Sequence, residues 1–312
     1  MYSKDKKEKI MTQPPHISVL LSSVLQVLED IHGTIIDATF GAGGYTRAFL
    51  QADSDRKVIA FDRDESTVRP FAQKMEHDFP GRFTFFADCF SQLDQHISEP
   101  VDAIVADLGV SSMQIDTPKR GFSWRFDAPL DMRMGNQSLT AKDIVNTYSE
   151  EELAHIIYIY GEEKASRRIA KNIVQNRPIL STGHLAEVIH QVMPRPKDGS
   201  DSAMRTFQAI RIAVNDELAE LERFLNVSAK LLKSGGKLVV VSFHSLEDRI
   251  VKDFLAQNAP KHTHTNKYGA DTTESSDFLF REISRKPVLP TPEELSANSR
   301  SHSAKLRWGV RA

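Results

Sequence analysis

The chain has 312 residues, 40% of them hydrophobic and 26% charged, which excludes a fibrous protein and a wholly disordered one. Its formal net charge of −2 excludes a globally basic protein, so contact with a polyanion needs a local basic patch. The single cysteine, Cys89, excludes an internal disulfide and a multi-thiolate metal site, and it fits a reducing compartment. Because no apolar run approaches the ~20 residues that span a bilayer, we expect a soluble, cytoplasmic protein.

In chain order, a polar, lysine-bearing lead-in over residues 1–15 is expected to be disordered. Helical spacing over residues 17–28 then precedes a β-branched run, TIIDATF at 34–40, which predicts a strand. The alternation continues through further strand candidates at 57–62, 82–88 and 102–108. Strands that alternate with helices predict an α/β fold with a parallel, doubly wound sheet.

The pattern changes over residues 111–201, where helix-like segments occur without a strand run. This segment predicts an inserted all-helical domain, which leaves a discontinuous core of residues 16–110 and 202–312. The core resumes with one long helix, whose apolar positions from Phe207 to Leu225 keep a three-to-four spacing, and Gly235-Gly236 ends it. After this helix we expect a buried strand at 237–243, a helix from His244, a mobile loop at 258–277 and a basic tail at 281–312.

A glycine-rich turn, GAGG at 41–44, lies between the first strand candidate and a helix. Such turns let backbone amides approach a ligand, but this one matches neither the G-x-G-x-x-G of dinucleotide sites nor a phosphate loop. Asp62, Asp88 and Asp107 lie at or near the ends of the next three strands, where open α/β sheets bind ligands. Asp62 is placed to accept ribose hydroxyls, and Asp88 is a candidate for an adenine amine. A tight turn and helix caps explain each feature equally well when it is taken singly.

The acidic edge of the predicted sheet has no phosphate-binding lysine nearby, so it suits a cationic cofactor better than an anionic pyrophosphate. S-adenosylmethionine combines an adenosine with a sulfonium cation. A nicotinamide dinucleotide would keep the same contact between an aspartate and a ribose. The glycine spacing favours the methyl donor over the dinucleotide.

Several long blocks of the sequence resemble one family, in that family's order. They read HISVLL at His16, DATFGAGGYT at Asp37, AFDRD at Ala60, DLGVSSMQID at Asp107, RGFSWRFDAPLDMRM at Arg120, YGEEKASRRIAKNIV at Tyr160, RTFQAIRIAVNDEL at Arg205 and SFHSLEDRIVKDF at Ser242. The chain is similar along nearly its whole length to the bacterial small-subunit ribosomal RNA cytosine-N4 methyltransferases, the RsmH or MraW family. The resemblance implies a Rossmann-like S-adenosylmethionine-dependent methyltransferase core, a helical insertion, and a 16S rRNA cytosine in the decoding region as acceptor.

The resemblance also assigns cofactor contacts residue by residue. They fall on Gly43, Gly44, Tyr45, Asp62, Phe90, Asp107 and Gln114. Tyr45 stands where the family commonly has histidine, and DSAM at 201–204 stands where it commonly has His-Pro-Ala-Thr. Asp88 is not among these contacts and is kept as a cofactor candidate on the strand-end argument alone.

Methyl transfer from a sulfonium is an in-line displacement, so positioning carries most of the catalysis. The exocyclic amine of cytosine is a poor nucleophile, and a hydrogen-bond acceptor such as Asp107 would favour its pyramidal form. His244, after the last apolar strand candidate, is a candidate to accept the proton that the amine loses. The alternatives for His244 are a helix cap and a contact with RNA phosphate.

Aromatic and basic side chains alternate in KRGFSWRF at 119–126, which suits an extruded base and makes Arg120 and Trp124 candidate RNA contacts. Arg205, at the start of its block, is a further candidate. A cationic stripe on the helix after Gly161 suits the RNA backbone, and it consists of Lys164, Arg167, Arg168 and Lys171. The alternatives are a loop anchored by its aromatic rings and a solvated helix face.

We therefore expect an S-adenosylmethionine-dependent rRNA (cytosine-N4-)-methyltransferase that acts on the small ribosomal subunit and its 16S rRNA, with no membrane partner. The alternatives are a methyltransferase of the same fold acting on DNA or another RNA, and a nucleotide-binding or nucleic-acid-binding module without transfer activity. No metal site is expected, because HTHT at 262–265 has no carboxylate or cysteine at ligand spacing. The sequence leaves the oligomeric state open, with a homodimer as one option.

Overall fold

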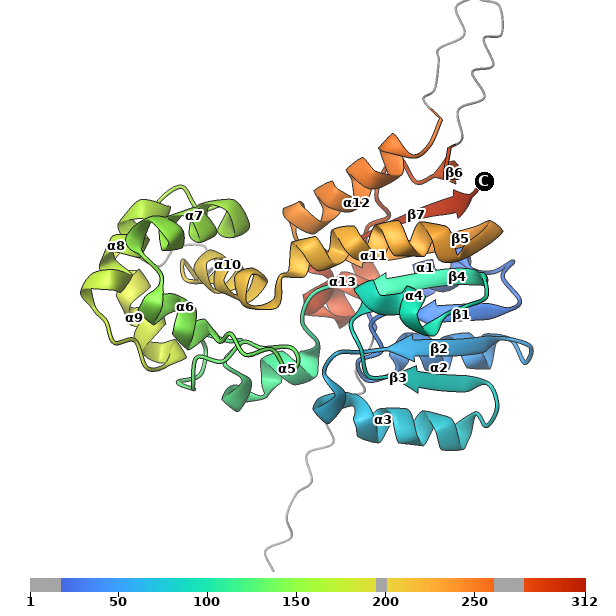
Figure 1. Ribbon diagram of the computed structural model, residues 1–312, viewed down its shortest axis with the longest axis horizontal. Coiled ribbons are helices and arrows are strands. Elements are labelled where there is room, and N and C mark those ends of the chain that lie inside the picture. Colours follow the sequence, from blue (N-terminus) through green and yellow to red (C-terminus); the bar gives the residue numbers. More distant parts are fainter. Residues whose placement is uncertain (1–17, 195–200, 261–277) are drawn as a thin grey trace, which may run out of the picture.

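The computed structural model describes residues 18–194, 201–260 and 278–312. Figure 1 shows a sheet with helices packed against it and, beside it, a separate group of helices, α6 to α10. The expected lead-in at 1–15, the HTHT run and most of the predicted loop at 258–277 lie outside the described residues. Within the described ranges, no helix is both long enough and apolar enough to cross a bilayer.

The sheet has seven strands in the order β3-β2-β1-β4-β5-β7-β6. Their bounds are β1 Thr34–Asp37, β2 Lys57–Phe61, β3 Phe83–Phe86, β4 Val101–Asp107, β5 Leu232–Ser242, β6 Phe280–Ile283 and β7 Lys305–Arg311. β1 to β5 pair in parallel, which confirms the predicted doubly wound α/β core. β7 is antiparallel to both β5 and β6, so the sheet has an antiparallel edge formed by β6 and β7, two strands that the sequence analysis did not predict.

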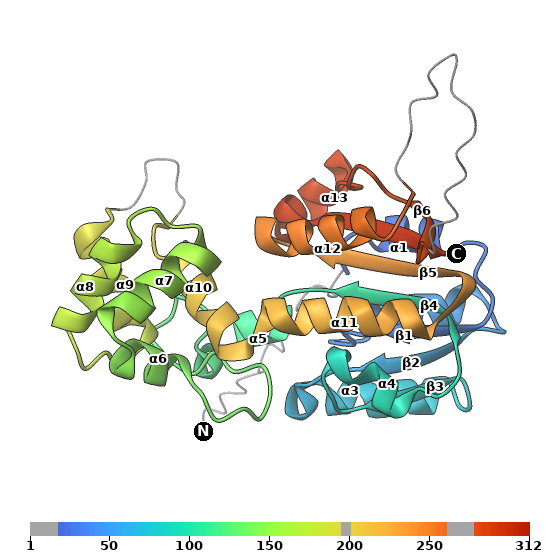
Figure 2. The same cartoon turned by 45° about the horizontal axis from the view of Figure 1, so that its top comes forward.

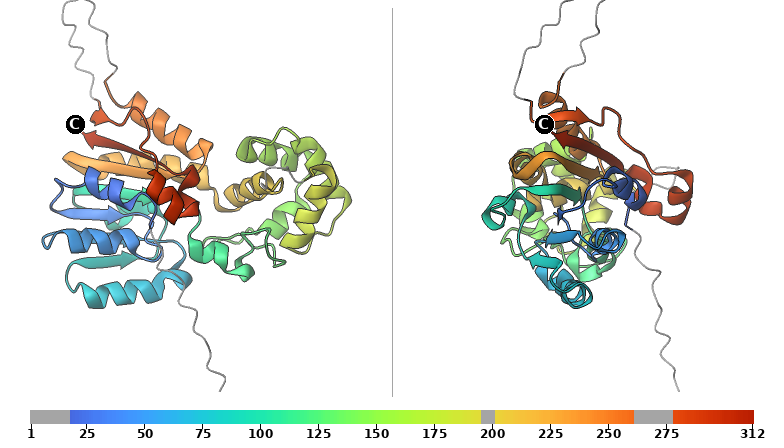
Figure 3. Two further views of the ribbon diagram at one scale, coloured as in Figure 1. Left: turned by 180° about the vertical axis from the view of Figure 1, so that it is seen from behind. Right: turned by 90° about the vertical axis from the view of Figure 1, so that its right-hand side faces the viewer.

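Alternate side chains of the parallel strands enter two different apolar cores. Ile35 and Val105 pack with α1, α2 and α3 on one face, and Ile36 and Ile104 pack with α4, α11 and α12 on the other. Because both faces are covered, the strands read as continuous apolar runs. These helices are α1 Leu21–Val27, α2 Gly44–Ala52, α3 Glu65–Asp78, α4 Leu93–His96, α11 Glu217–Leu231 and α12 Ser245–Gln257. Figures 2 and 3 show the two helix layers from different sides.

The chain between β4 and α11 contains the helices expected in the insertion. They are α5 Ser112–Asp116, α6 Ala141–Thr147, α7 Glu150–Gly161, α8 Ser166–Gln175, α9 Thr182–Val192 and α10 Met204–Asn215. Thr140 and Ser149 begin α6 and α7 with capping boxes, which satisfy backbone N–H groups that a helix start leaves free. Ile157, Ile173 and Phe207 belong to the apolar core that joins α6 to α10.

The single long helix predicted through Phe207 and Leu225 is wrong, because the chain forms two helices there. α10 ends at Asn215, and α11 begins after Asp216, whose backbone is left-handed with a φ of 51°. The apolar spacing continues across the break because α10 packs in the helical core while α11 packs on the sheet. The helix ends at Leu231, so the glycine pair predicted to end it lies inside β5 instead.

The basic tail at 281–312 is folded onto the core. It forms β6, β7, α13 (Pro292–Ala297) and a short 3-10 helix, η3 (Ser299–Ser303); two other short 3-10 helices are η1 (Phe90–Gln92) and η2 (Pro118–Arg120). Lys305 and Arg307 form ion pairs with Asp248 at 3.0 and 2.6 Å, and Arg300 pairs with Asp116 at 2.8 Å. All three cations therefore have a carboxylate partner within the molecule, and Lys305 and Arg307 share the single charge of Asp248.

Candidate functional site

The glycine turn lies at the carboxyl ends of β1 and β2, beside Asp62. Gly41 and Gly43 have φ values of 52° and 77°, a region that favours glycine. The backbone N–H of Gly41 donates to Oδ2 of Asp62 at 2.9 Å, and the N–H of Asp64 donates to Oδ1 at 2.9 Å. A carboxylate has about four acceptor positions, so Asp62 keeps room for a ligand's hydroxyls.

Packing inside the protein also requires the glycines of this turn. A Cβ at Gly44 would lie 2.0 Å from Oγ of Ser18, and one at Gly43 would lie 2.7 Å from Cε of Met75. Tyr45 turns its buried ring into the core, where its hydroxyl donates to the carbonyl of Val19. A side-chain role for Tyr45 at a ligand stays a prediction, and its backbone remains part of the turn.

Asp107 ends β4 on the opposite side of the turn from Asp62. Its N–H donates to Oγ1 of Thr39 at 2.7 Å, which fixes the strand end against the turn. Its Oδ1 is buried, and no described residue donates a hydrogen bond to it. Burial, followed by the nearby carboxylates of Asp37 and Glu247, raises the pKa of Asp107 well above its usual range. A buried carboxyl without a partner is costly in free energy and is typical of functional sites.

Asp37, at the end of β1, is a further acid of this cluster that the sequence analysis did not select. Burial raises its pKa from 3.8 to about 6, although the hydroxyl of Thr46 donates to it at 2.6 Å. The charge of Asp62 raises that pKa further. Asp37 ends a strand directly before the glycine turn, so the strand-end argument used for Asp62 would have identified it as well.

Gln114 and Arg120 connect the segment after β4 to the segment after β2. Nε2 of Gln114 donates to Oδ2 of Asp64 at 2.8 Å, and its Oε1 accepts from the N–H of Ser111 at 2.9 Å. Nη1 of Arg120 lies 2.7 Å from the same Oδ2, and Nη2 donates to the carbonyl of Arg133 at 2.8 Å. Both side chains are therefore occupied in holding the site together, and the RNA contact expected of Arg120 stays a prediction.

Asp88 and Phe90 lie after β3, at the far side of β2. The carboxylate of Asp88 accepts from the N–H of Cys89 at 2.7 Å and lies 2.8 Å from Nε2 of His96. Phe90 packs edge-on against Phe224, with ring centroids 5.0 Å apart. Within the described ranges, no hydrogen bond joins Asp88 to Asp62 or to the glycine turn. The adenine contacts expected of Asp88 and Phe90 stay predictions.

His244 begins α12 directly after β5, as its N-cap residue. Its Nδ1 accepts from the N–H of Glu247 at 3.4 Å, so in the neutral ring the proton lies on Nε2. Nε2 is 3.2 Å from Oε1 of Glu247 but makes no hydrogen bond to any described residue. Burial raises the pKa of Glu247, but His244 and the N–H of Phe243 outweigh burial and hold that pKa below its usual range.

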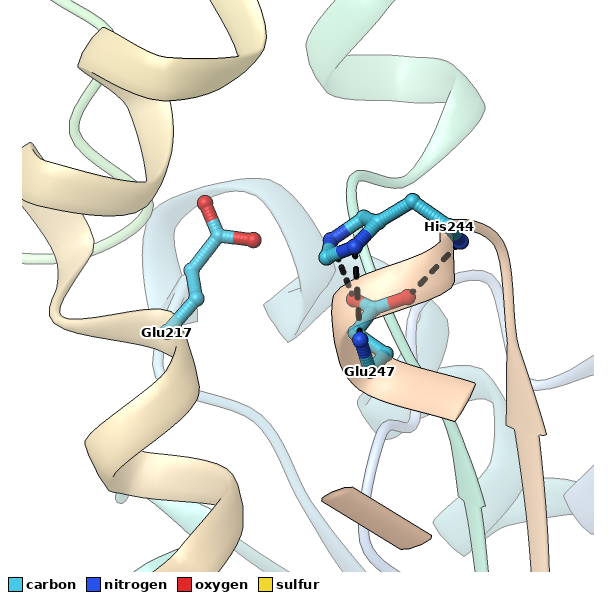
Figure 4. Close-up of side chains that lie close together, drawn as sticks. All are labelled: Glu217, His244 and Glu247. Atoms are coloured by element: carbon cyan, nitrogen blue, oxygen red, sulfur yellow. Dashed lines mark hydrogen bonds and ion pairs between the residues drawn. The ribbon is translucent and has the colours of Figure 1, made fainter. Parts of the chain in front are cut away.

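Figure 4 shows Glu217, from the start of α11, facing His244 and Glu247. Ligand atoms of these three side chains lie within 4.8 Å of one another, as in a metal site. Each carboxylate already has partners, because Glu217 pairs with Arg211 at 2.8 Å and Glu247 accepts from the N–H of Phe243 at 2.8 Å. The expectation of no metal site stays a prediction.

The predicted cationic stripe is exposed on the helical group. Arg167, Arg168 and Lys171 lie on α8, whereas Lys164 lies in the turn before Ser166, where the helix begins. Among the described residues, no carboxylate forms an ion pair with these four. Nη2 of Arg168 contacts the sulfur of Met193 at 3.0 Å.

The other RNA candidates lie nearby on the helical group. Trp124 is half-buried and packs edge-on against Phe207 at 5.8 Å, so it anchors its loop to the helical core. Arg205, on the first turn of α10, is exposed, and its Nη1 donates to the carbonyl of Glu162 at 3.2 Å. The contacts of both residues with RNA stay predictions.

Comparison with known proteins places the chain in a family. Residues 13–311 match the model of the MraW methylase family. The chain belongs to this family. A Cereibacter sphaeroides protein is 50% identical over 306 residues, which cover 95% of this chain and 90% of that protein. A Paramagnetospirillum magneticum protein is 49% identical over 310 residues, covering 96% and 97%. Both carry the name ribosomal RNA small subunit methyltransferase H. An rRNA methylase structure from Streptococcus thermophilus aligns over 95% of this chain and 98% of its own, at 11% identity and a TM-score of 0.43.

The family resemblance inferred from the sequence blocks is thereby confirmed. In this MraW methylase, the structure brings the glycine turn, Asp62 and Asp107 together at one edge of the sheet. It also adds Glu247 and Arg211, which the sequence analysis missed. They lie on different helices and meet only through folding, so no local pattern marks them.

Proposed function

We propose that this MraW methylase transfers a methyl group from S-adenosylmethionine to N4 of a cytosine in the decoding region of 16S rRNA, on the small ribosomal subunit. Family membership and the names of its relatives support the reaction class and the substrate. The observation that carries the assignment of the site is Asp107, which lies beside the glycine turn and whose buried Oδ1 has no hydrogen-bond donor among the described residues.

The residues at this edge fit the proposed methyl donor. Asp62 has free acceptor positions for the two ribose hydroxyls, and the turn at 41–44 adjoins it, because the N–H of Gly41 donates to its carboxylate. Asp37, whose pKa is about 6, is ionised above that pH and then supplies negative charge nearby, which favours a cation, whereas the raised pKa of Asp107 favours its neutral form. When bound, S-adenosylmethionine supplies an electrophilic methyl group on a positively charged sulfur.

Asp107 is our candidate for the residue that contacts the acceptor amine. Its unpartnered Oδ1 can accept an N–H hydrogen bond, which withdraws the nitrogen lone pair from the ring and orients it. His244 is a weaker candidate for the proton acceptor, because the hydrogen bond from Glu247 to Nδ1 leaves the proton on Nε2. We assign His244 to positioning α12 beside the site.

We infer that the helical group binds the rRNA. Its exposed stripe of Lys164, Arg167, Arg168 and Lys171 presents cations that are free to meet phosphates. The division expected at residues 110/111 and 201/202 is also a proposal. The packing of α10 in the helical core favours a second boundary near Asn215, and we place it there.

The test compares substrates for one enzyme preparation. We expect methyl transfer from labelled S-adenosylmethionine to small ribosomal subunits, with less to naked 16S rRNA and none to duplex DNA. Mass mapping of rRNA nucleosides should then locate an N4-methylcytidine in the decoding region. Methylation of DNA alone would contradict the substrate assignment, and failure to bind S-adenosylhomocysteine would contradict the enzyme assignment.

A further inference from the structure

A pocket of about 200 Å³ lies between the sheet and the connection to the helical group. One wall is the start of α3 with the two residues before it, lined by Arg63 to Ser66. The other wall is formed by Arg120 and the loop that carries Asp131, Arg133, Gly135 and Asn136. The pocket therefore adjoins Asp62, next to Arg63 in the chain, without including any residue of the glycine turn.

The charged side chains of this pocket are paired with one exception. Arg120 pairs with Asp64 at 2.7 Å, and Arg133 pairs with Asp131 at 2.8 Å. Glu65 pairs with Arg69, outside the pocket. Among the described residues, Arg63 forms no ion pair, and the nearby charge that it feels is that of Asp62, whose pKa it lowers.

Arg63 is also held in place with a free donor. Its Nη1 donates to the carbonyl of Asn215 at 3.2 Å, which fixes the guanidinium between the sheet and α10. Its Nε is buried and has no acceptor within the described residues. A buried donor without an acceptor costs free energy, so the protein itself does not satisfy all the donors of this guanidinium.

The start of α3 adds a second feature that favours an anion. α3 has 14 residues, and the carboxylate of its N-cap residue, Asp64, accepts from the hydroxyls of Ser66 and Thr67 at 3.2 and 2.9 Å but makes no hydrogen bond to the backbone of the first turn. The first N–H groups of a helix carry a partial positive charge and bind phosphate readily. Glu65 and Ser66 of this turn line the pocket.

We propose that this pocket binds one backbone phosphate of the rRNA strand that carries the target cytosine, with Arg63 as its main contact. The proposal rests on the proposed function, because it takes the acceptor to be RNA. A base that is extruded into a site beside Asp62 leaves its flanking phosphates at the rim, where proteins commonly grip the backbone. The planar set of N–H donors on an arginine guanidinium matches the oxygens of a phosphate.

The experiment measures the affinity for small ribosomal subunits at several salt concentrations, with Arg63→Gln compared with the wild type. Loss of one phosphate contact lowers the slope of log affinity against log salt by about 0.7 to 0.9. A fourfold rise in salt should then weaken binding of the variant about 2.6- to 3.5-fold less than binding of the wild type. Affinity for S-adenosylhomocysteine should stay unchanged.

Arg47→Gln is the matched control, because Arg47 is an arginine outside the pocket, paired with Asp78, which also lies outside it. It should leave the slope unchanged. Arg63→Met keeps the apolar stem and should repeat the result of Arg63→Gln if that variant folds poorly.

An unchanged slope in both Arg63 variants overturns the proposal. So does a parallel loss of S-adenosylhomocysteine affinity, which would place Arg63 in the cofactor site. Failure of the proposed function would appear separately, as a wild-type protein that does not methylate small subunits.

Discussion

The carboxyl groups of Asp37, Asp62 and Asp107 lie together, and burial raises the pKa of each. For Asp37 the pKa is about 6, compared with an ordinary value of 3.8. Between these two values the folded chain keeps a proton that the unfolded chain has lost. The contribution of Asp37 to stability is therefore greatest below about pH 4 and falls as the pH rises through 6. Ionisation of Asp37 therefore lowers the stability of the protein, at the place where we expect a cation to bind.

The first prediction concerns Asp62. Asp62→Ala should weaken the binding of S-adenosylhomocysteine by about 1 to 3 kcal/mol, because charge-assisted hydrogen bonds to the ribose are lost. Calorimetric titration measures the change. Asp78→Ala is the control, since this exposed carboxylate pairs with Arg47 on the surface and should leave the affinity unchanged. Equal affinities for wild type and Asp62→Ala would contradict the ribose contact.

The second prediction is a difference between two ligands. S-adenosylmethionine should bind more tightly as the pH rises from 5 to 7, because Asp37 loses its proton near pH 6 and the edge becomes more negative. S-adenosylhomocysteine has a neutral sulfur and should respond less. Titrations of both ligands across this range test the prediction, and Asp37→Asn should reduce the difference. Identical pH profiles for the two ligands would be inconsistent with a sulfonium beside these acids.

Among the elements, α8 separates two functions on its two sides. Ile169 and Ile173 are buried in the helical core, while Arg167, Arg168 and Lys171 face outward. Because the cationic side chains have no carboxylate partners among the described residues, their charges are free for an external anion. If these cations bind RNA as we propose, stability and RNA binding should be separable by substitutions on this helix.

The third prediction uses that separation. The double variant Arg167→Gln, Lys171→Gln should lower the salt slope of binding to small subunits by about 1.4 to 1.8, at 0.7 to 0.9 per lost phosphate contact. Thermal stability should change little, because exposed unpaired side chains contribute little to folding. Glu150→Gln, in the first turn of α7, is a charge-changing control on the same group of helices. A slope equal to that of the wild type would exclude α8 from the RNA interface.

At the scale of the whole molecule, the helical group and the sheet have separate apolar cores. Ile157 is fully buried in the helical core, far in the chain from the glycine turn. Truncation of such a side chain leaves a cavity whose cost depends on how far the site relaxes. A substitution that destabilises one core should therefore first unfold the part of the molecule that contains that core.

The fourth prediction follows. Ile157→Ala should lower the free energy of unfolding of the helical group by about 2 to 5 kcal/mol, measured as an earlier calorimetric transition. S-adenosylhomocysteine should still bind with wild-type affinity, since the residues proposed to hold it lie on the sheet. Ile36→Ala is the matched control in a sheet core and should affect ligand binding. Joint loss of stability and ligand binding in Ile157→Ala would mean that the two cores unfold as one unit.

The sequence predicted most of the sheet and its acidic edge because both depend on local patterns. β-branched runs marked the parallel strands, and their last residues placed Asp62 and Asp107 at one edge. The break at Asp216 was not predictable, because an aspartate in a left-handed conformation carries no such signal. Contacts between distant segments, such as Gln114 with Asp64, were also hidden, since folding alone brings them together.

The helical group leaves the sheet two residues after Asp107, at Gly109, and returns through Asp216. A ribonucleoprotein particle that binds these helices therefore exerts force on a backbone segment that continues directly to Asp107. Asp107 is the residue that we place at the acceptor amine. We expect alignment of the reacting atoms to depend on how well the particle matches the helices in shape. Recognition would then extend beyond the target nucleotide to the architecture of its surroundings, so that a misassembled particle is a poor substrate even when its sequence is correct.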